Sequence, residues 1–208
     1  IEKVPVENWA GKVLKEKNNF AQLGGLISLA RLGGKEHQAP VIKALLALDY
    51  AELKPQERYD FLRAYGLTFL RLGAPDAKQK AAVIAQLDSY YPSDSAFENI
   101  ELSNVLGYLQ TPDMITRSVE LITNAPTQEE QIAIAKNIRF VKQGWTDESE
   151  KKLFIWFSRA AGYKGGASFN NFINEIKKDH LARLSAKRKK ALASIINAKP
   201  VTKNPLSS

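Results

Sequence analysis

Leu29-Ala30-Arg31-Leu32-Gly33 ends an apolar helix, and related stretches return twice further along the chain. They are Phe69-Leu70-Arg71-Leu72-Gly73 and Gly107-Tyr108-Leu109-Gln110. The stretches recur at a nearly constant interval of roughly 40 residues, a period typical of helical-repeat proteins. Each stretch is followed by a short polar break and a second apolar helix. Because a pair of helices of this length cannot bury both of its apolar faces alone, the sequence predicts that successive pairs stack into an array.

The hydrophobic pattern predicts an all-α chain with eleven helices and essentially no strands. Valine and isoleucine recur at helical intervals, as at Ile132, Ile138 and Val141, rather than in the alternation typical of strands. Prolines or capping residues followed by acidic residues mark several helix starts, and Thr127 with Glu130 fits a capping box. The prediction is an N-terminal helix over 7–17 and five antiparallel pairs: 19–32 with 37–48, 56–72 with 76–89, 97–109 with 112–123, 127–141 with 147–161, and 169–183 with 186–197.

The composition excludes several classes of chemistry. The chain of 208 residues has no cysteine, which removes disulfides, thiolate catalysis, cysteine-bound metal centres and covalent c-type haem attachment from this segment. No apolar run approaches the roughly 20 residues that a membrane-spanning helix needs, so no membrane insertion is expected. The chain opens on Ile1-Glu2-Lys3 without a signal sequence, and we expect it to be a piece of a longer protein.

The titratable residues do not form a recognisable catalytic or metal-binding pattern. His37 and His180 lie in different helix pairs, and neither has a second ligand at a known metal spacing. The acidic residues at 129–130 and 147–150 fall in the first turns of helices, where they complement the helix dipole. We therefore predict no catalytic residues, no metal site, no cofactor in this segment and no enzymatic activity. Trp145 and Trp156 are expected to be largely buried where the fourth and fifth pairs meet.

The positive charge of the chain is concentrated at its C-terminal end. Residues 168–208 hold nine Lys or Arg against two acidic residues, a net charge of +7, while the whole chain has a net charge of +8. Within the run at 187–190 no acidic residue stands nearby in the sequence. Such a run is either a solvated helix face or a docking site for an anionic partner. The candidate partner-binding residues are Lys177, Lys178, Arg183, Lys187, Arg188, Lys189 and Lys190.

The segment from Pro126 to Ala198 carries more than generic repeats. The stretches Pro126-Thr127-Gln128-Glu129-Glu130-Gln131, Gly144-Trp145-Thr146, Tyr163-Lys164-Gly165-Gly166 and Ile176-Lys177-Lys178-Asp179 resemble the helical region of large bacterial extracytoplasmic haem-binding proteins. In that family a HEAT-like helical segment precedes a c-type cytochrome domain. The resemblance implies an intervening module of a periplasmic or otherwise extracytoplasmic protein, with haem only in a downstream domain that carries the Cys-x-x-Cys-His motif missing here.

These observations lead to one expected architecture and two functional hypotheses. The expected fold is an all-α, HEAT-like superhelix of about five antiparallel helix pairs plus an N-terminal helix, forming one domain over 1–199 with a linker over 200–208. The favoured hypothesis is a non-catalytic scaffold that binds neighbouring domains of the parent chain or a protein partner. The alternative is nucleic-acid binding of the kind found in helical-repeat DNA glycosylases, through the basic C-terminal repeat. The part of the chain before Ser168 is nearly neutral, which disfavours a basic groove shared among repeats.

Overall fold

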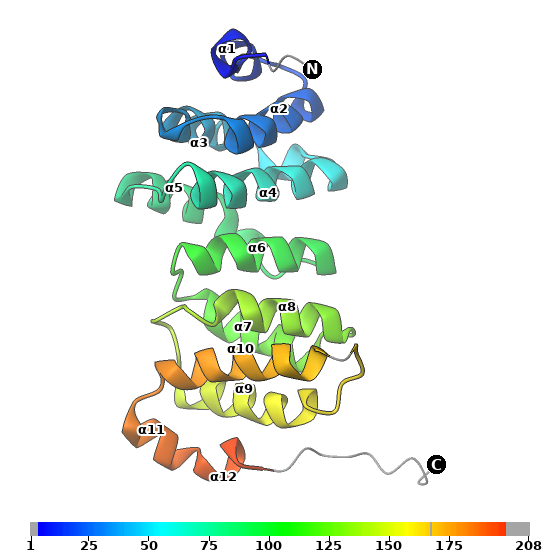
Figure 1. Cartoon of the computed structure of the whole chain (residues 1–208), viewed down its shortest axis with the longest axis vertical. Coiled ribbons are helices and arrows are strands. Elements are labelled where there is room, and N and C mark those ends of the chain that lie inside the picture. The colour runs from blue at the N-terminus through cyan, green and yellow to red at the C-terminus, as the bar shows by residue number, and fades with distance from the viewer. Residues whose placement is uncertain (1–3, 167, 199–208) are drawn as a thin grey trace. The chain divides into compact units, whose positions relative to one another are not determined.

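The computed structural model describes residues 4–166 and 168–198, and every regular element in this part of the chain is helical (Figure 1). The all-α prediction is therefore confirmed for the described residues. Four short 3-10 segments accompany the α-helices, at Val6–Asn8, Lys35–His37, Tyr50–Glu52 and Asp88–Tyr90. The α-helices are α1 (Ala10–Val13), α2 (Asn19–Leu32), α3 (Gln38–Leu46), α4 (Pro55–Arg71), α5 (Ala77–Leu87), α6 (Ala96–Tyr108), α7 (Met114–Asn124), α8 (Gln128–Ile138), α9 (Asp147–Ala160), α10 (Phe169–Arg183), α11 (Ala186–Ala191) and α12 (Ala193–Ile196).

The predicted helices differ from the observed ones at the two ends of the chain. The helix expected over 7–17 is a 3-10 turn at Val6–Asn8 followed by the four-residue α1. The helix expected over 186–197 is divided at Leu192 into α11 and α12. Both segments are short, and isolated helices of this length are marginal without tertiary packing. The longer helices expected from the sequence are therefore interrupted by local geometry rather than replaced by another kind of structure.

Side-chain caps explain where several helices begin. Asp76 accepts a hydrogen bond from the backbone N–H of Gln79 at 2.7 Å, and the Gln79 side chain accepts from the Asp76 N–H at 2.9 Å. Thr146 and Ser149 form the same reciprocal arrangement at the start of α9. Each pair satisfies donors at a helix start that have no partner within the helix. At the predicted box, Thr127 accepts from the Glu130 N–H, which is one of the two hydrogen bonds of a capping box.

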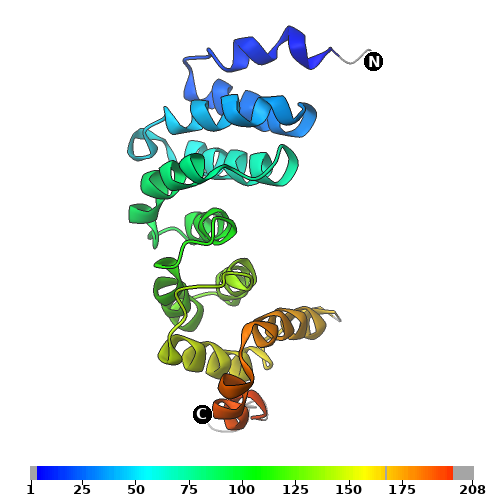
Figure 2. The same ribbon diagram turned by 90° about the vertical axis from the view of Figure 1, so that its left-hand side faces the viewer.

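The chain forms two compact units, which divide between Leu109 and Gln110. In unit 1, α2 packs against α4 and α4 packs against α6, while α3 contacts α2, α4 and α5. Figures 1 and 2 show α2, α4 and α6 following one another along this unit. Its core is filled by large apolar side chains that are almost completely inaccessible to solvent: Leu23, Leu26, Leu29, Val41, Leu45, Tyr50, Phe61, Leu62, Tyr65, Val83, Leu87, Leu102 and Leu106.

A glutamine links three helices of unit 1. The Gln86 side chain in α5 donates hydrogen bonds to the carbonyl oxygens of Leu45 and Leu48, at 3.1 and 3.0 Å, and accepts one from the Tyr65 hydroxyl in α4. Leu45 and Leu48 lie at and just beyond the C-terminal end of α3, where carbonyls have no partner within the helix. Gln86 therefore closes the end of α3 and ties it to α4 and α5.

In unit 2, α7 contacts α8 and α9, α9 contacts α12, and α10 contacts α8 and α9. Its core contains Ile115, Ile122, Ile134, Ile138, Leu153, Phe154, Trp156, Phe157 and His180. Trp156 is only 1% exposed, and its indole N–H donates to the Gln131 side chain of α8 at 2.8 Å, which confirms its expected burial. Trp145 is only half-buried, so the prediction was too strong for that residue.

The repeat register inferred from the sequence needs a correction. The sequence pattern treats Leu32, Leu72 and Leu109 as equivalent, yet Leu32 is 64% exposed whereas Leu72 and Leu109 are 3% and 2% exposed. The recurring stretches mark the ends of helices, but their leucines do not lie on the same face of each helix. The expectation of a single domain over 1–199 stays a prediction, and the linker expected over 200–208 lies outside the described residues.

Candidate interaction surfaces

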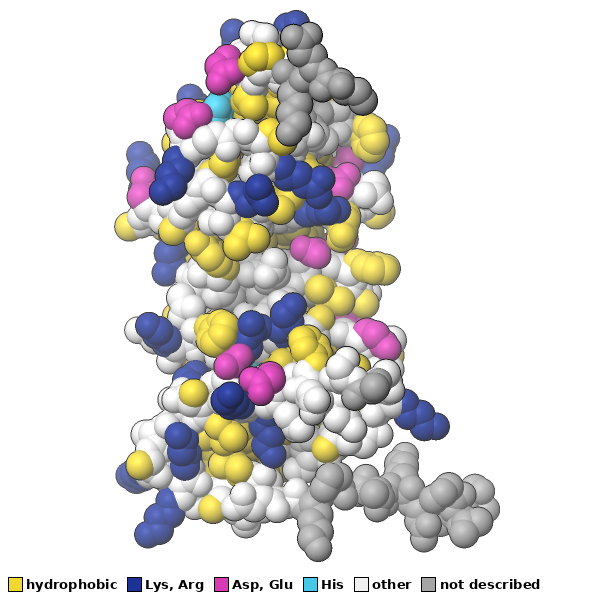
Figure 3. Space-filling model, in the orientation of Figure 1, with side chains coloured by type: hydrophobic (Ala, Val, Ile, Leu, Met, Phe, Trp, Pro, Cys, Tyr) yellow, Lys and Arg dark blue, Asp and Glu magenta, His cyan; other side chains and the backbone are white. Residues whose placement is uncertain are grey.

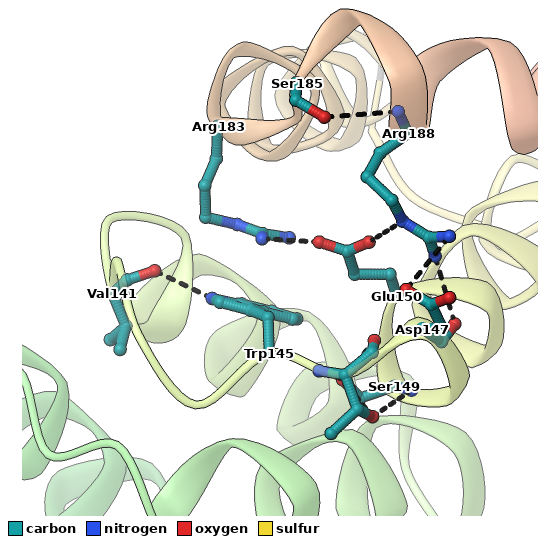
Figure 4. Close-up of polar contacts among 9 residues, drawn as sticks. Val141, Trp145, Asp147, Ser149, Glu150, Arg183, Ser185 and Arg188 are labelled. Atoms are coloured by element: carbon teal, nitrogen blue, oxygen red, sulfur yellow. Dashed lines mark hydrogen bonds and ion pairs between the residues drawn. The ribbon is translucent and has the colours of Figure 1, made fainter.

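Glu150 is the centre of an ionic cluster that joins three helices of unit 2 (Figure 4). Its carboxylate in α9 accepts hydrogen bonds from Arg183 Nη1 at 2.9 Å and from Arg188 Nε at 2.7 Å. Arg188 also forms an ion pair with Asp147 at 3.0 Å. Glu150 is only 7% exposed, so its charge depends on these two guanidinium groups for compensation. We call these four residues the Glu150 cluster.

The Trp145 indole supports one side of this cluster. The Arg183 guanidinium carbon lies 3.6 Å from the centre of the Trp145 ring, and the indole N–H donates to the Val141 carbonyl at 2.8 Å (Figure 4). A guanidinium over an indole face gains a cation–π attraction, which is stronger when the pair is partly removed from water. Burial lowers the pKa of Arg183, while the hydrogen bond to Glu150 raises it. Arg183 is thus held between an aromatic face and a carboxylate.

The two histidines occupy different environments, and His180 is completely buried. His180 is 0% exposed, its Nε2 lies 2.9 Å from the Ala135 carbonyl, and its ring meets Trp145 edge to face. Burial lowers the pKa of His180 to about 3, so the ring is neutral at physiological pH. His37 lies next to Glu36, with 3.0 Å between Nδ1 and the carboxylate. Because His180 is sealed in the core, it is placed as a structural residue of unit 2.

The structure separates the seven predicted partner-binding residues into two groups. Arg183 and Arg188 are engaged by the Glu150 cluster, Lys177 donates to the Ile196 carbonyl at 2.9 Å, and Lys178 pairs with Glu175 at 3.5 Å. Burial lowers the pKa of Lys177. The other three residues, Lys187, Lys189 and Lys190, are exposed and form no ion pair with a described residue. We call these three residues the lysine edge.

No acidic residue stands near the basic run in the sequence, but two acidic residues lie next to it in three dimensions. Asp147 and Glu150 are far from Arg188 in the sequence, yet they contact it directly. The sequence correctly placed both acidic residues in the first turn of α9 but gave no sign that α11 folds back onto that turn. A positively charged helix opposite an acidic helix start was the signal that could have suggested the pairing. Figure 3 shows Lys and Arg side chains gathered over the part of unit 2 that α11 occupies.

Unit 1 presents a second surface, which the sequence analysis did not single out. Apart from Val4, the large apolar side chains that are exposed in its described residues all lie on α2, α4 or α6, and none lies on α3 or α5. Leu32, Leu70 and Tyr108 occupy the last or last but one position of these three helices. We call these three residues the apolar row. Phe20 and Phe97 are exposed at the opposite, N-terminal ends of α2 and α6.

Within the described residues, no group of three or more His, Cys, Asp or Glu side chains is arranged to hold a metal ion. None of the described helices combines the length and apolar character required to cross a lipid bilayer. Comparison with protein-family models, curated proteins and solved structures gave no match. The surfaces of the two units are therefore the features from which a function can be inferred.

Proposed function

We propose that this chain is a non-catalytic helical-repeat interaction module, a HEAT-like α-α superhelix that docks an anionic partner through the lysine edge of unit 2. The observation that carries this proposal is that one basic residue of α11 is paired with acidic residues while the other three are exposed. Arg188 is committed to Asp147 and Glu150, which anchors the helix, while Lys187, Lys189 and Lys190 remain exposed on it. Cations on an anchored helix lose little conformational freedom on binding, so they favour docking more than the same charges on a loose tail.

The parent protein is proposed from the resemblance to extracytoplasmic haem-binding proteins. In that setting the module is periplasmic or otherwise extracytoplasmic, and the partner is a neighbouring domain of the same chain or another protein. The haem belongs to a separate cytochrome domain, and this segment contributes shape and charge rather than a cofactor. Acidic carboxylates on the partner would pair with the lysine edge, with the charges steering the encounter and fixing its orientation.

The lysine edge is tested by reversing its charge without disturbing the Glu150 cluster. The variant Lys187→Glu/Lys189→Glu/Lys190→Glu keeps Arg188, and its matched control Lys142→Glu/Lys151→Glu/Lys164→Glu makes the same change in charge at other exposed lysines of unit 2. We expect the lysine-edge variant to bind the neighbouring domains of the full-length gene product at least about tenfold more weakly than the control does. Wild-type binding should weaken as the salt concentration rises from about 0.1 M to about 1 M, because the Debye length falls from about 10 Å to about 3 Å.

Duplex DNA is titrated in parallel, because the alternative function makes a different prediction. A nucleic-acid-binding protein would bind DNA of any sequence tightly and lose that binding when the lysine edge is reversed. That result would replace the proposal by the alternative. Equal binding of the parent domains by the wild type and the lysine-edge variant would also contradict the proposal, leaving the lysines as a solubilising end of the array.

A further inference from the structure

The apolar row of unit 1 lies at the neighbouring ends of three helices. Arg71 of α4 donates from Nη2 to the carbonyl of Arg31 in α2 at 3.3 Å, which places the C-terminal ends of α2 and α4 side by side. Tyr108 of α6 stacks on Phe69 of α4, with 5.3 Å between ring centres and 12° between planes. Its hydroxyl also reaches the Phe69 carbonyl. Leu32, Leu70 and Tyr108 therefore share one edge of the layer formed by α2, α4 and α6.

Two further pairs of residues show that α4 and α6 lie side by side with a constant offset along the sequence. A Cβ built on Gly66 would lie 3.3 Å from the side-chain nitrogen of Asn104. Burial raises the pKa of Glu101, and the nearby positive charge of Arg63 opposes this rise. Both pairs have the same offset along the sequence as Leu70 and Tyr108. The two helices therefore stay aligned over about two turns, and Leu70 and Tyr108 lie at the C-terminal end of this aligned stretch.

The apolar row is not required to fill the core of unit 1. Leu72 and Leu109, which lie close to it in sequence, are almost completely buried and close the interior at the same helix ends. Leu32, Leu70 and Tyr108 are 64%, 77% and 47% exposed. A contiguous exposed apolar patch on a folded protein is a mark of a binding surface, whereas a single exposed leucine is ordinary.

Cations accompany the apolar row and define the charge of its partner. Arg31 directly precedes Leu32, and Arg71 directly follows Leu70. Both arginines are exposed and form no ion pair with a described residue, and both offset the partial negative charge at a helix C-terminus. Arg71 uses one N–H on the Arg31 carbonyl, but a guanidinium has five donors, so both side chains retain donors for carboxylates.

We propose that the apolar row binds a peptide segment of a partner protein in the polyproline II conformation, in which apolar residues recur at every third position with acidic residues between them. Packed helix axes lie about 8–10 Å apart, and a polyproline II chain has three residues per turn and rises about 3.1 Å per residue. Every third side chain therefore faces the same way, and one turn of the peptide spans the step from one helix to the next. The apolar side chains rest on Leu32, Leu70 and Tyr108, and the intervening carboxylates pair with Arg31 and Arg71. This surface is separate from the lysine edge.

The test uses the full chain and a fluorescein-labelled peptide of about ten residues, with Leu at every third position and Glu and Thr between, because in a polyproline II chain this spacing puts the leucines on one face at the step between helices. Binding is followed by fluorescence anisotropy. We expect the wild type to bind this peptide at least about tenfold more tightly than a peptide of identical composition whose leucines are consecutive, or one in which Lys replaces Glu. The variant Leu32→Ser/Leu70→Ser should lose at least about tenfold in affinity.

The control variant Phe140→Ser/Phe172→Ser removes two exposed aromatic side chains from unit 2, and it should bind the spaced peptide like the wild type. Circular dichroism and urea unfolding confirm that both variants remain folded, which is expected because the substituted side chains are exposed. A separate variant, Arg31→Glu, should weaken binding of the acidic peptide and favour the lysine-containing one. Binding of the spaced peptide should not change in the lysine-edge variant, so the two proposals can fail separately.

Three results would overturn this inference. The first is equal binding of the spaced and rearranged peptides by the wild type. The second is unchanged affinity in Leu32→Ser/Leu70→Ser. The third is a wild type that sediments as a dimer and a Leu32→Ser/Leu70→Ser variant that sediments as a monomer, which would assign the apolar row to contacts between copies of this chain.

Discussion

At the scale of single residues, burial decides which side chains are structural and which are available to a partner. His180 and Trp156 are removed from solvent, whereas Trp145 keeps part of its surface exposed and carries the Arg183 guanidinium on its ring. The sequence pattern distinguished apolar faces from polar faces, but it could not show which of two tryptophans on neighbouring segments is more deeply buried. Their relative burial depends on the path of α10, which brings Arg183 and His180 against Trp145 from a distant part of the chain.

The buried His180 makes a prediction for stability against pH. Its pKa is about 3 in the folded protein and about 6.5 in an unfolded chain, so the unfolded state binds the proton more readily between these values. Stability contributed by the neutral ring is therefore complete above about pH 6.5 and is lost as the pH falls toward 3. Between about pH 6.5 and pH 5 the loss should be about 2 kcal/mol, from about 1.36 kcal/mol for each pH unit.

The measurement compares the wild type with His180→Phe, which keeps an aromatic ring in the core but cannot titrate. Free energies of unfolding from urea titrations at pH 7 and pH 5 should fall more in the wild type than in the variant, by about 2 kcal/mol. Other groups titrate in both proteins and cancel in the difference. An identical pH dependence for the two proteins would show that His180 is solvated in the native state.

At the scale of elements, short helices depend on side-chain anchors more than on their own length. The segment α11–α12 comprises two helices of six and four residues, too short to be stable alone. It is held to α9 by contacts of α12 and by the Glu150 cluster. The sequence predicted one continuous helix over 186–197, whereas the structure divides it at Leu192, whose φ of −98° and ψ of 5° lie outside the α-helical range.

Replacing Glu150 should therefore loosen these elements selectively. Glu150→Gln leaves Arg183 and Arg188 without their shared carboxylate, and we expect the free energy of unfolding to fall by about 2 kcal/mol. This value is below the range for fully buried pairs, because both arginines keep some contact with water. The substitution should speed the exchange of backbone amides with solvent more in α11 and α12 than in α7.

Glu148→Gln is the matched control for this change. Glu148 stands in the same first turn of α9, but its side chain is 76% exposed and its partner is Lys152. The control should alter stability by less than about 0.5 kcal/mol. A comparable effect of both substitutions would assign the loss to the dipole of α9 rather than to the Glu150 cluster.

At the scale of the whole molecule, the repeat pattern predicted the succession of helices well and the surfaces poorly. Helices α2 to α10 lie close to their predicted ranges, because periodicity and caps are local signals. Neither the pairing of Glu150 with Arg188 nor the alignment of Leu70 with Tyr108 is local. Both pairings depend on the register in which the helices stack. The recurring stretches that contain Leu72 and Leu109 suggested a register that differs from the observed one.

The division into two compact units leads to a prediction about folding. Unit 1 buries its own set of apolar side chains, and unit 2 buries another, centred on Trp156, Phe157 and His180. A domain of about 100 residues can bury enough apolar surface to fold independently. We therefore expect the fragments 1–109 and 110–208 each to give a helical circular dichroism spectrum and a cooperative urea transition when expressed alone.

The tryptophans provide a direct readout for the second fragment. Trp145 and Trp156 belong to unit 2, so the fluorescence of the fragment 110–208 should report the packing of its core. In the full chain, Glu150→Gln should shift the transition of unit 2 and leave that of unit 1 in place, because stability changes remain within independently folding units. Unfolded fragments, together with one shared transition in the full chain, would contradict independent folding. That result would support the single domain over 1–199 that the uninterrupted succession of repeats predicts, since stacked repeats stabilise one another through their interfaces.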